Sequence, residues 1–309
     1  MEQQRLPLLA SLMGLGAGVV WSFGGITSRL ADHTDAFQYM VWRSLGVMVV
    51  IEIMFALKGN RWPTYRAWTS GNTMRLANFG LFLASIAFVY AVKTTTPATA
   101  AFLGSLTPLV AVVFARFLGE RLSRSTIVAL VVALVGLVLT VVGDLDAGNM
   151  VGNISALLAC VGFAIYTVCL RTDTTRDWSP VLSGYALMMV VVCTTVVLIE
   201  GKTLVPPVGD IGWALLHGAV FIVLGTVLFN AASKQVPAVP MTVFAQTEMV
   251  FVPIWAFLIL GMTPKPLSVL GGVIIFFAVV GKAFFDARDR KSTRLNSSHS
   301  SVSRMPSSA

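Results

Sequence analysis

Apolar segments of about 20 residues follow one another along most of this chain. A helix of about that length crosses a bilayer, because each residue adds about 1.5 Å of rise and the hydrocarbon core is about 30 Å thick. Ten such segments can be placed, at residues 6–29, 36–58, 73–95, 97–118, 125–143, 150–171, 179–200, 210–234, 237–261 and 266–285. The sequence therefore predicts an all-α integral membrane protein with ten transmembrane helices.

The composition agrees with a location in lipid. Of 309 residues, 56% are hydrophobic and only 12% are charged, against about 25% charged in an ordinary soluble domain. The net charge of +8 does not indicate nucleic-acid binding, because the basic residues are scattered over short loops without a basic-aromatic face. Cys160, Cys169 and Cys193 all fall within apolar segments, so we interpret them as small buried hydrophobes, neither disulfide-bonded nor metal-binding.

The distribution of Lys and Arg predicts the orientation. With the N-terminus in the cytoplasm, fifteen of these residues fall on the cytoplasmic side and four on the outer side. This bias follows the positive-inside rule. We expect a multi-pass protein of a bacterial-type cytoplasmic (inner) membrane with both termini in the cytoplasm.

The chain also contains an internal repeat. Tyr90-Ala-Val-Lys-Thr-Thr-Thr-Pro97-Ala has a counterpart in Asn230-Ala-Ala-Ser-Lys-Gln-Val-Pro237-Ala, roughly 140 residues later. We predict two repeats of five helices, at 1–145 and 146–290. Because five is odd, the two copies must be inverted relative to each other, and such pairs place a solute site near the midplane. Residues 291–309 hold eight serines in nineteen positions, so we expect a disordered tail that resembles a vector-derived extension.

Several short motifs resemble those of a known family. They are Ala17-Gly-Val-Val-Trp21-Ser-Phe-Gly, Trp42-Arg43-Ser-Leu, Thr107-Pro108-Leu-Val, Leu118-Gly119-Glu120-Arg121-Leu122 and Gln246-Thr-Glu248-Met-Val-Phe-Val-Pro253-Ile-Trp255. In this order the chain resembles the EamA-type members of the drug/metabolite transporter superfamily. The resemblance implies ten helices, a central cavity shared by the halves, and export or exchange of amino acids, metabolites or drugs. Gly261-Met262 departs from the family, which usually has Gly-Glu there.

Glu248 is the first candidate for the transport site. It lies eleven residues beyond Pro237, or roughly 16 Å into the membrane. A carboxylate at mid-membrane costs about 2.5–3.5 kcal/mol on insertion scales, so it should face a wet cavity or a partner. We interpret it as a site for a substrate ammonium group or a proton, with a buried structural hydrogen bond as the alternative.

Arg43 is the second candidate, roughly 10 Å deep from the outer side. It could bind a substrate carboxylate or pair with Glu248, or its side chain could extend back to the outer headgroups. Glu52, nine positions further along, is better interpreted as a structural charge. His217 is better interpreted as a hydrogen-bonded histidine than as a metal ligand.

The remaining candidates are helix breaks and lining residues. Thr107-Pro108 precedes Thr247-Glu248 by the same 140 residues, and a proline at mid-membrane is tolerated only beside protein or water. Pro108 and Pro253 are the expected helix breaks. Gly14 and Gly18 form a small-residue face for helix contact. The predicted substrate-lining residues, for which ordinary packing is the alternative, are Trp21, Asn78, Phe82, Thr107, Tyr166 and Gln246.

The leading function is secondary transport of an amino acid-like or drug-like metabolite by alternating access, with Glu248 as candidate proton carrier. No P-loop is present in the sequence, and we expect no cofactor, no metal and no catalytic residues. The alternatives are a channel or a non-transporting sensor and, less favoured, an intramembrane enzyme. The expected partners are a small-molecule substrate and the lipid bilayer, and the sequence leaves a homodimer open.

Overall fold

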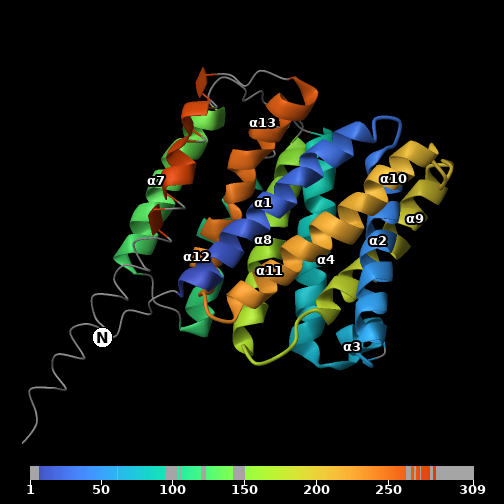
Figure 1. Ribbon diagram of the computed structural model, residues 1–309, viewed down its shortest axis with the longest axis horizontal. Coiled ribbons are helices and arrows are strands. Elements are labelled where there is room, and N and C mark those ends of the chain that lie inside the picture. Colours follow the sequence, from blue (N-terminus) through green and yellow to red (C-terminus); the bar gives the residue numbers. More distant parts are fainter. Residues whose placement is uncertain are drawn as a thin grey trace, which may run out of the picture.

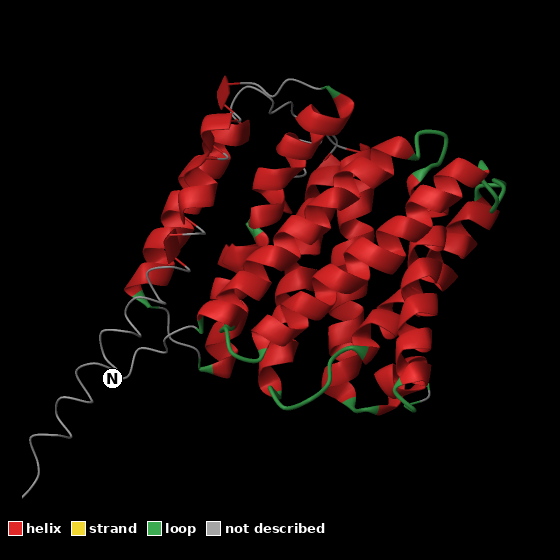
Figure 2. Ribbon diagram, viewed as in Figure 1, coloured by secondary structure: helices red, strands yellow, loops and turns green. Residues whose placement is uncertain are grey.

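A computed structural model describes residues 7–60, 62–94, 103–104, 106–119, 123–141, 150–261, 266–267, 269–271, 273–278 and 281–282. Within these residues the regular structure is entirely helical, and short loops join the helices (Figure 2). The predicted all-helical membrane fold is confirmed at this level. Pro97 of the repeated motif, Glu120 and Met262 of the family comparison, and the tail at 291–309 lie outside the described residues.

Seven helices in the described part of the chain are long and apolar enough to span a membrane. They are α1 (Leu8–Leu30), α2 (Ala36–Leu57), α4 (Asn72–Thr94), α8 (Met150–Thr172), α9 (Pro180–Ile199), the composite of α10 (Val208–Leu216), η2 (His217–Ile222) and α11 (Val223–Ser233), and the composite of α12 (Ala238–Ala245) and α13 (Thr247–Leu260). Each coincides with a predicted span.

Shorter apolar helices lie where the other three spans are predicted. These are α6 (Thr107–Ala115) with the 3-10 turn η1 (Arg116–Leu118), α7 (Arg124–Val141), and a helical segment within 269–278. The sequence did not predict α3 (Pro63–Thr69), a short helix in the connection between α2 and α4. Its first residue is proline, whose fixed φ and missing N–H suit the first turn of a helix.

The first helices of the two halves run in opposite directions. α1 and α8 both contain 23 residues. In Figure 1, α1 ends at the upper edge of the molecule, where a loop leads into α2, whereas α8 ends at the lower edge, where a loop leads into α9. α1 and α8 are therefore antiparallel.

Glycines bring several of these helices into close contact. A Cβ atom at Gly162 of α8 would lie 2.5 Å from the amide nitrogen of Ala84 and 2.6 Å from the carbonyl oxygen of Gly80, both in α4. On α1, the predicted small-residue face is confirmed. A Cβ at Gly14 would lie 3.1 Å from the Phe244 ring, and one at Gly18 would lie 3.0 Å from the Ala245 carbonyl oxygen. Such contacts let dispersion forces hold apolar helices together in lipid.

The ends of the helices are joined by polar contacts between loops. The Arg176 guanidinium donates a 3.3 Å hydrogen bond to the carbonyl oxygen of Ser70, and both residues belong to predicted cytoplasmic loops. At the opposite end, Lys202 pairs with Asp35 at 2.9 Å. Asp35 also caps α2, since its carboxylate accepts hydrogen bonds from the N–H groups of Phe37 and Gln38 at 2.8 and 3.0 Å. The two loops predicted to be cytoplasmic thus meet at one end of the bundle, and Lys202, predicted to be on the outer side, lies at the other end.

The Gly80–Gly162 contact predicts a strong cost for added volume. The change Gly162→Ala should lower the thermal unfolding temperature in detergent, because its methyl group would collide with the α4 backbone, and such overpacking costs about 1–3 kcal/mol. Gly212→Ala is the matched control, since no atom lies within 4 Å of a Cβ there. An unfolding temperature for Gly162→Ala equal to that of Gly212→Ala would contradict the close packing.

The Asp35 cap predicts a dependence of stability on pH. Partial burial by itself raises the pKa of Asp35, but hydrogen bonds from Gln38, Lys202 and Phe37 outweigh it and leave the pKa below its ordinary 3.8. Ionised Asp35 therefore stabilises the folded protein above about pH 4, and this contribution is lost as the pH falls through the folded-state value. We expect Asp35→Asn to be less stable than the wild type at about pH 6 and to approach it at about pH 3. A gap in unfolding temperature that stays constant with pH would contradict this role.

Candidate functional site

Two membrane helices are interrupted at matching positions in the two halves. In the second half, the break falls at Gln246, between α12 and α13. The Gln246 N–H bonds the Val243 carbonyl at 3.0 Å, and the Thr247 hydroxyl donates to the Phe244 carbonyl at 2.6 Å. In the first half, Leu106 and Thr107 make the same bonds, to Leu103 at 3.1 Å and to Gly104 at 2.6 Å. Each atom pair is displaced by 140 residues, so the repeat preserves the interruption itself.

The positions of the prolines relative to these breaks differ from the prediction. Pro108 stands in the first turn of α6, next to the break at Leu106, as expected. Pro253 lies inside α13, which continues from Thr247 to Leu260 without interruption. The second break is therefore at Gln246, where a tight turn and the Thr247 hydroxyl take up backbone groups that a continuous helix would use.

Glu248 lies in the first turn of α13, directly after the break. The residue as a whole is partly exposed, although its carboxylate lies deep within the protein. The described residues offer its carboxylate neither a hydrogen bond nor an ion pair. The predicted alternative, a buried structural hydrogen bond, thus has no partner here, while the N-terminal end of α13 favours a negative charge.

α1 packs against the break at Gln246. A Cβ at Gly18 would lie 3.0 Å from the Glu248 amide nitrogen and from the Thr247 Cβ. In the first half, the Cys160 thiol of α8 donates to the carbonyl oxygens of Leu103 and Gly104 at 3.0 and 3.3 Å. Gly18 and Cys160 are both the eleventh residue of their helices, counted from Leu8 and Met150. Each break therefore rests on the matching turn of the first helix of one repeat.

A cluster of aromatic rings lies where α1 and α8 meet. The ring of Trp21 packs edge-on against that of Phe163 with 5.8 Å between centroids, and against Phe229 at 5.2 Å. Trp21 is partly exposed, whereas Tyr166 is completely buried and donates its hydroxyl hydrogen to Asn230. Phe163 and Phe229 were not predicted. The repeat could have identified Phe163, because it occupies the same position in α8 as Trp21 does in α1.

A second group of rings lies beyond Glu248 on the same face of α13. Phe251 and Trp255 follow Glu248 by three and seven residues, which is the spacing of one helix face. Trp255 stacks on Phe23 with centroids 4.5 Å apart, and its indole N–H donates to the Ser22 hydroxyl at 2.8 Å. Sequence reasoning missed Phe23 and Phe251, although the helical spacing from Glu248 pointed to the latter.

Arg43 is buried in the bundle, with 5% of its surface exposed. It does not extend to the outer surface, because its guanidinium donates a hydrogen bond to Ser85 of α4. The predicted pair with Glu248 is not found among the described residues. Nearby, the Tyr39 hydroxyl and His217 Nδ1 share a 2.8 Å hydrogen bond. His217 is thus a hydrogen-bonded histidine, as predicted.

Other predicted residues have contacts elsewhere. Asn78 has no exposed surface, and its side-chain amide donates to the Ala67 carbonyl of α3 at 2.9 Å, so it joins helices rather than meeting the groups above. Phe82 packs partly buried against the main apolar core. The carboxylate of Glu52 accepts hydrogen bonds from the hydroxyls of Thr64 and Ser183, in agreement with its structural interpretation.

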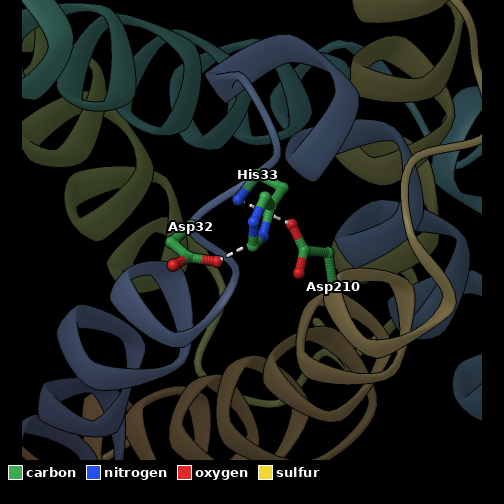
Figure 3. Close-up of side chains that lie close together, drawn as sticks. All are labelled: Asp32, His33 and Asp210. Carbon is green, nitrogen blue, oxygen red and sulfur yellow. Dashed lines mark hydrogen bonds and ion pairs between the residues drawn. The ribbon is translucent and has the colours of Figure 1, made fainter.

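Asp32 and His33, in the loop that joins α1 to α2, form a small polar cluster with Asp210 of α10 (Figure 3). His33 Nδ1 lies 2.6 Å from Asp32 Oδ1, and its backbone N–H donates to Asp210 Oδ2 at 3.0 Å. The Thr34 hydroxyl donates to the same Asp210 oxygen. Both of these hydrogen bonds join Asp210 of α10 to residues of the loop. We therefore interpret buried Asp210 as a tether between the loop and α10.

Comparison with known proteins agrees with this architecture. The model of the EamA-like transporter family matches residues 8–142 and 150–282. The uncharacterized transporter YyaM of Bacillus subtilis (strain 168) is 23% identical over 84% of this chain and 89% of its own length. The pseudopaline exporter CntI of Pseudomonas aeruginosa (strain UCBPP-PA14) is 26% identical over 63% of this chain and 69% of its own length.

One solved crystal structure shares the fold. It superimposes with a TM-score of 0.76 at 18% sequence identity, over 90% of this chain and 98% of the other. At that identity the likeness concerns the arrangement of helices alone.

Proposed function

Because the chain belongs to the EamA-like transporter family, we propose that it moves a small metabolite across the membrane as a secondary transporter that works by alternating access. We further propose ten spans in two inverted repeats, at 1–145 and 146–290, in a bacterial-type cytoplasmic membrane. The antiparallel course of α1 and α8 and the paired helix breaks support the inverted repeat. In this scheme the halves rock about a site near the midplane.

The observation that carries the proposal is the pair of breaks with Glu248 beside one of them. Irregular backbone at membrane depth is tolerated where it is buried in protein or lines a water-filled space, and transporters use such breaks to form their sites. Glu248 has exposed surface and no described partner. An ionisable group in that setting marks a substrate or ion pathway. Glu248 is thus the proposed proton or ammonium site.

The residues around the breaks take the other roles. Gln246 and Thr107 stand at the two interruptions, where their polar groups can contact the substrate, and Trp21 supplies a partly exposed ring at the junction of α1 and α8. Tyr166 positions the aromatic cluster through its bond to Asn230. One of the relatives is named as an exporter, which supports export or exchange as the direction.

Glu248→Gln tests the role of the carboxylate. A thermal-stabilisation screen of purified protein against amino acids, polyamines, nucleosides and quaternary amines supplies the substrate for transport in proteoliposomes. We expect wild-type transport to respond to an imposed pH gradient and the variant to lose that response, with a rate lower by about tenfold or more, the size of an interaction worth about 1.4 kcal/mol.

Glu200→Gln is the matched control, because Glu200 is exposed and pairs with Lys202 at the protein surface. It should transport like the wild type. Transport by Glu248→Gln that equals the wild type from about pH 6 to about pH 8 would contradict proton coupling through this group. Single-channel currents from the wild type would favour a channel instead.

Thiol labelling tests the orientation. In a variant without the three native cysteines, a single cysteine at Lys202 should react with a membrane-impermeant reagent added outside intact cells, because the positive-inside rule places that loop outside. A single cysteine at Lys58 should react only after the cells are permeabilised. Labelling of both positions from the same side would contradict the proposed topology, because they lie at opposite ends of the bundle.

A further inference from the structure

Arg43 is a buried cation without a counter-charge in the described part of the chain. Its Nη2 donates to the Ser85 hydroxyl, but its Nε–H has no acceptor. Among the described residues, no carboxylate forms an ion pair or a hydrogen bond with its guanidinium. Guanidinium carries five N–H donors and stays ionised in proteins. Since a buried charge is costly unless it is paired, Arg43 is a candidate to bind an anion.

The position of Arg43 is fixed by the backbone around it. A Cβ at Gly218 would lie 1.8 Å from the Arg43 carbonyl oxygen, so α2 and η2 meet there with no room for a side chain. A Cβ at Gly46 would likewise lie 2.8 Å from the Leu215 carbonyl. η2 is a π-helical segment, a feature that often accompanies functional sites. The backbone of Arg43 is therefore held in place before any ligand arrives, and the Ser85 hydroxyl holds its guanidinium, which lowers the cost of binding.

The geometry points to Arg43 as the group that binds a carboxylate of the transported molecule, so that the substrates are amino acids or other small carboxylic acids. The planar guanidinium, with a free Nε–H, matches the two oxygens of a carboxylate better than a point charge does. Ser85 is a positioning residue, since its hydroxyl holds Nη2 and sets the plane of the guanidinium. The inference rests on the proposed transport function and specifies its substrate class.

A ligand series on the purified full-length protein tests this assignment. Thermal stabilisation is measured with amino acids and small carboxylic acids, each beside its methyl ester, and with the amine that each amino acid becomes on losing its carboxyl group. Sodium chloride and sodium phosphate are tested alone. We expect stabilisation by at least one carboxylic acid and none by its ester or amine, because only the ionised acid supplies two oxygens that share a negative charge.

Variants then assign the effect to Arg43. Arg43→Gln should weaken binding of the effective acid by roughly thirtyfold or more, and Arg43→Lys should restore only part of it. Arg66→Gln is the matched control and should bind like the wild type, because Arg66 belongs to α3 and lies over the Phe55 ring at the C-terminal end of α2. If Arg43→Gln does not fold, Ser85→Ala provides a milder test, with affinity for the acid about fivefold lower.

Three binding results would overturn the assignment. They are equal stabilisation by acid and ester, full acid affinity in Arg43→Gln or Ser85→Ala, and Arg43-dependent stabilisation by chloride or phosphate as large as that by any carboxylic acid, which would make the ligand an inorganic ion. Transport of a compound without a carboxylate, dependent on Glu248 but not on Arg43, would also overturn it while leaving the transporter role intact. The absence of any transport would instead count against the proposed function, since the acid–ester comparison is a binding measurement.

Discussion

The structure depends on one constraint of the bilayer, which is that backbone N–H and C=O groups must find partners inside the protein. Uninterrupted helices meet this demand by themselves, and glycine contacts such as Gly80–Gly162 then pack them closely. The two breaks meet it with local bonds from Thr107 and Thr247 and with tight turns at Leu106 and Gln246. Because α1 and α8 press on these breaks through Gly18 and Cys160, an irregular backbone persists at a depth where lipid would not tolerate it.

The same constraint separates structural charges from functional ones. Glu52 and Asp210 are held by hydroxyl and amide donors, so their charges are compensated by the fold. Glu248 and Arg43 differ, because each keeps bonding capacity that the described residues leave unused. Charges in a membrane protein are expensive, so unused capacity of this kind supports the proposal that these two residues bind a ligand.

Sequence reasoning located these two residues by depth alone, counting rise per residue from the nearest helix end. It was less successful where side-chain direction matters. Asn78 shares a helix face with Phe82 and Ser85 in the pattern, yet its amide turns to the Ala67 carbonyl, whereas Ser85 turns to Arg43. Proline suggested a break at Pro253, but the hydroxyl of Thr247 and the turn at Gln246 decide where the helix stops. Phe23 and Phe229 became visible as members of these clusters only through contacts between helices, whereas the repeat and the helical spacing pointed to Phe163 and Phe251.

The sequence by itself determined the membrane location, the approximate spans and the kinship of the two halves, because hydrophobic length and a repeat period are properties of the chain read in order. The tertiary structure decided which polar groups are satisfied and which are not. That distinction depends on neighbours distant in sequence, such as Ser85 for Arg43 and Gly18 for the break at Gln246. The sequence shows that a carboxylate or a guanidinium is present, but not which groups face it. Only the packed arrangement of helices therefore separates a structural tether from a proposed binding site.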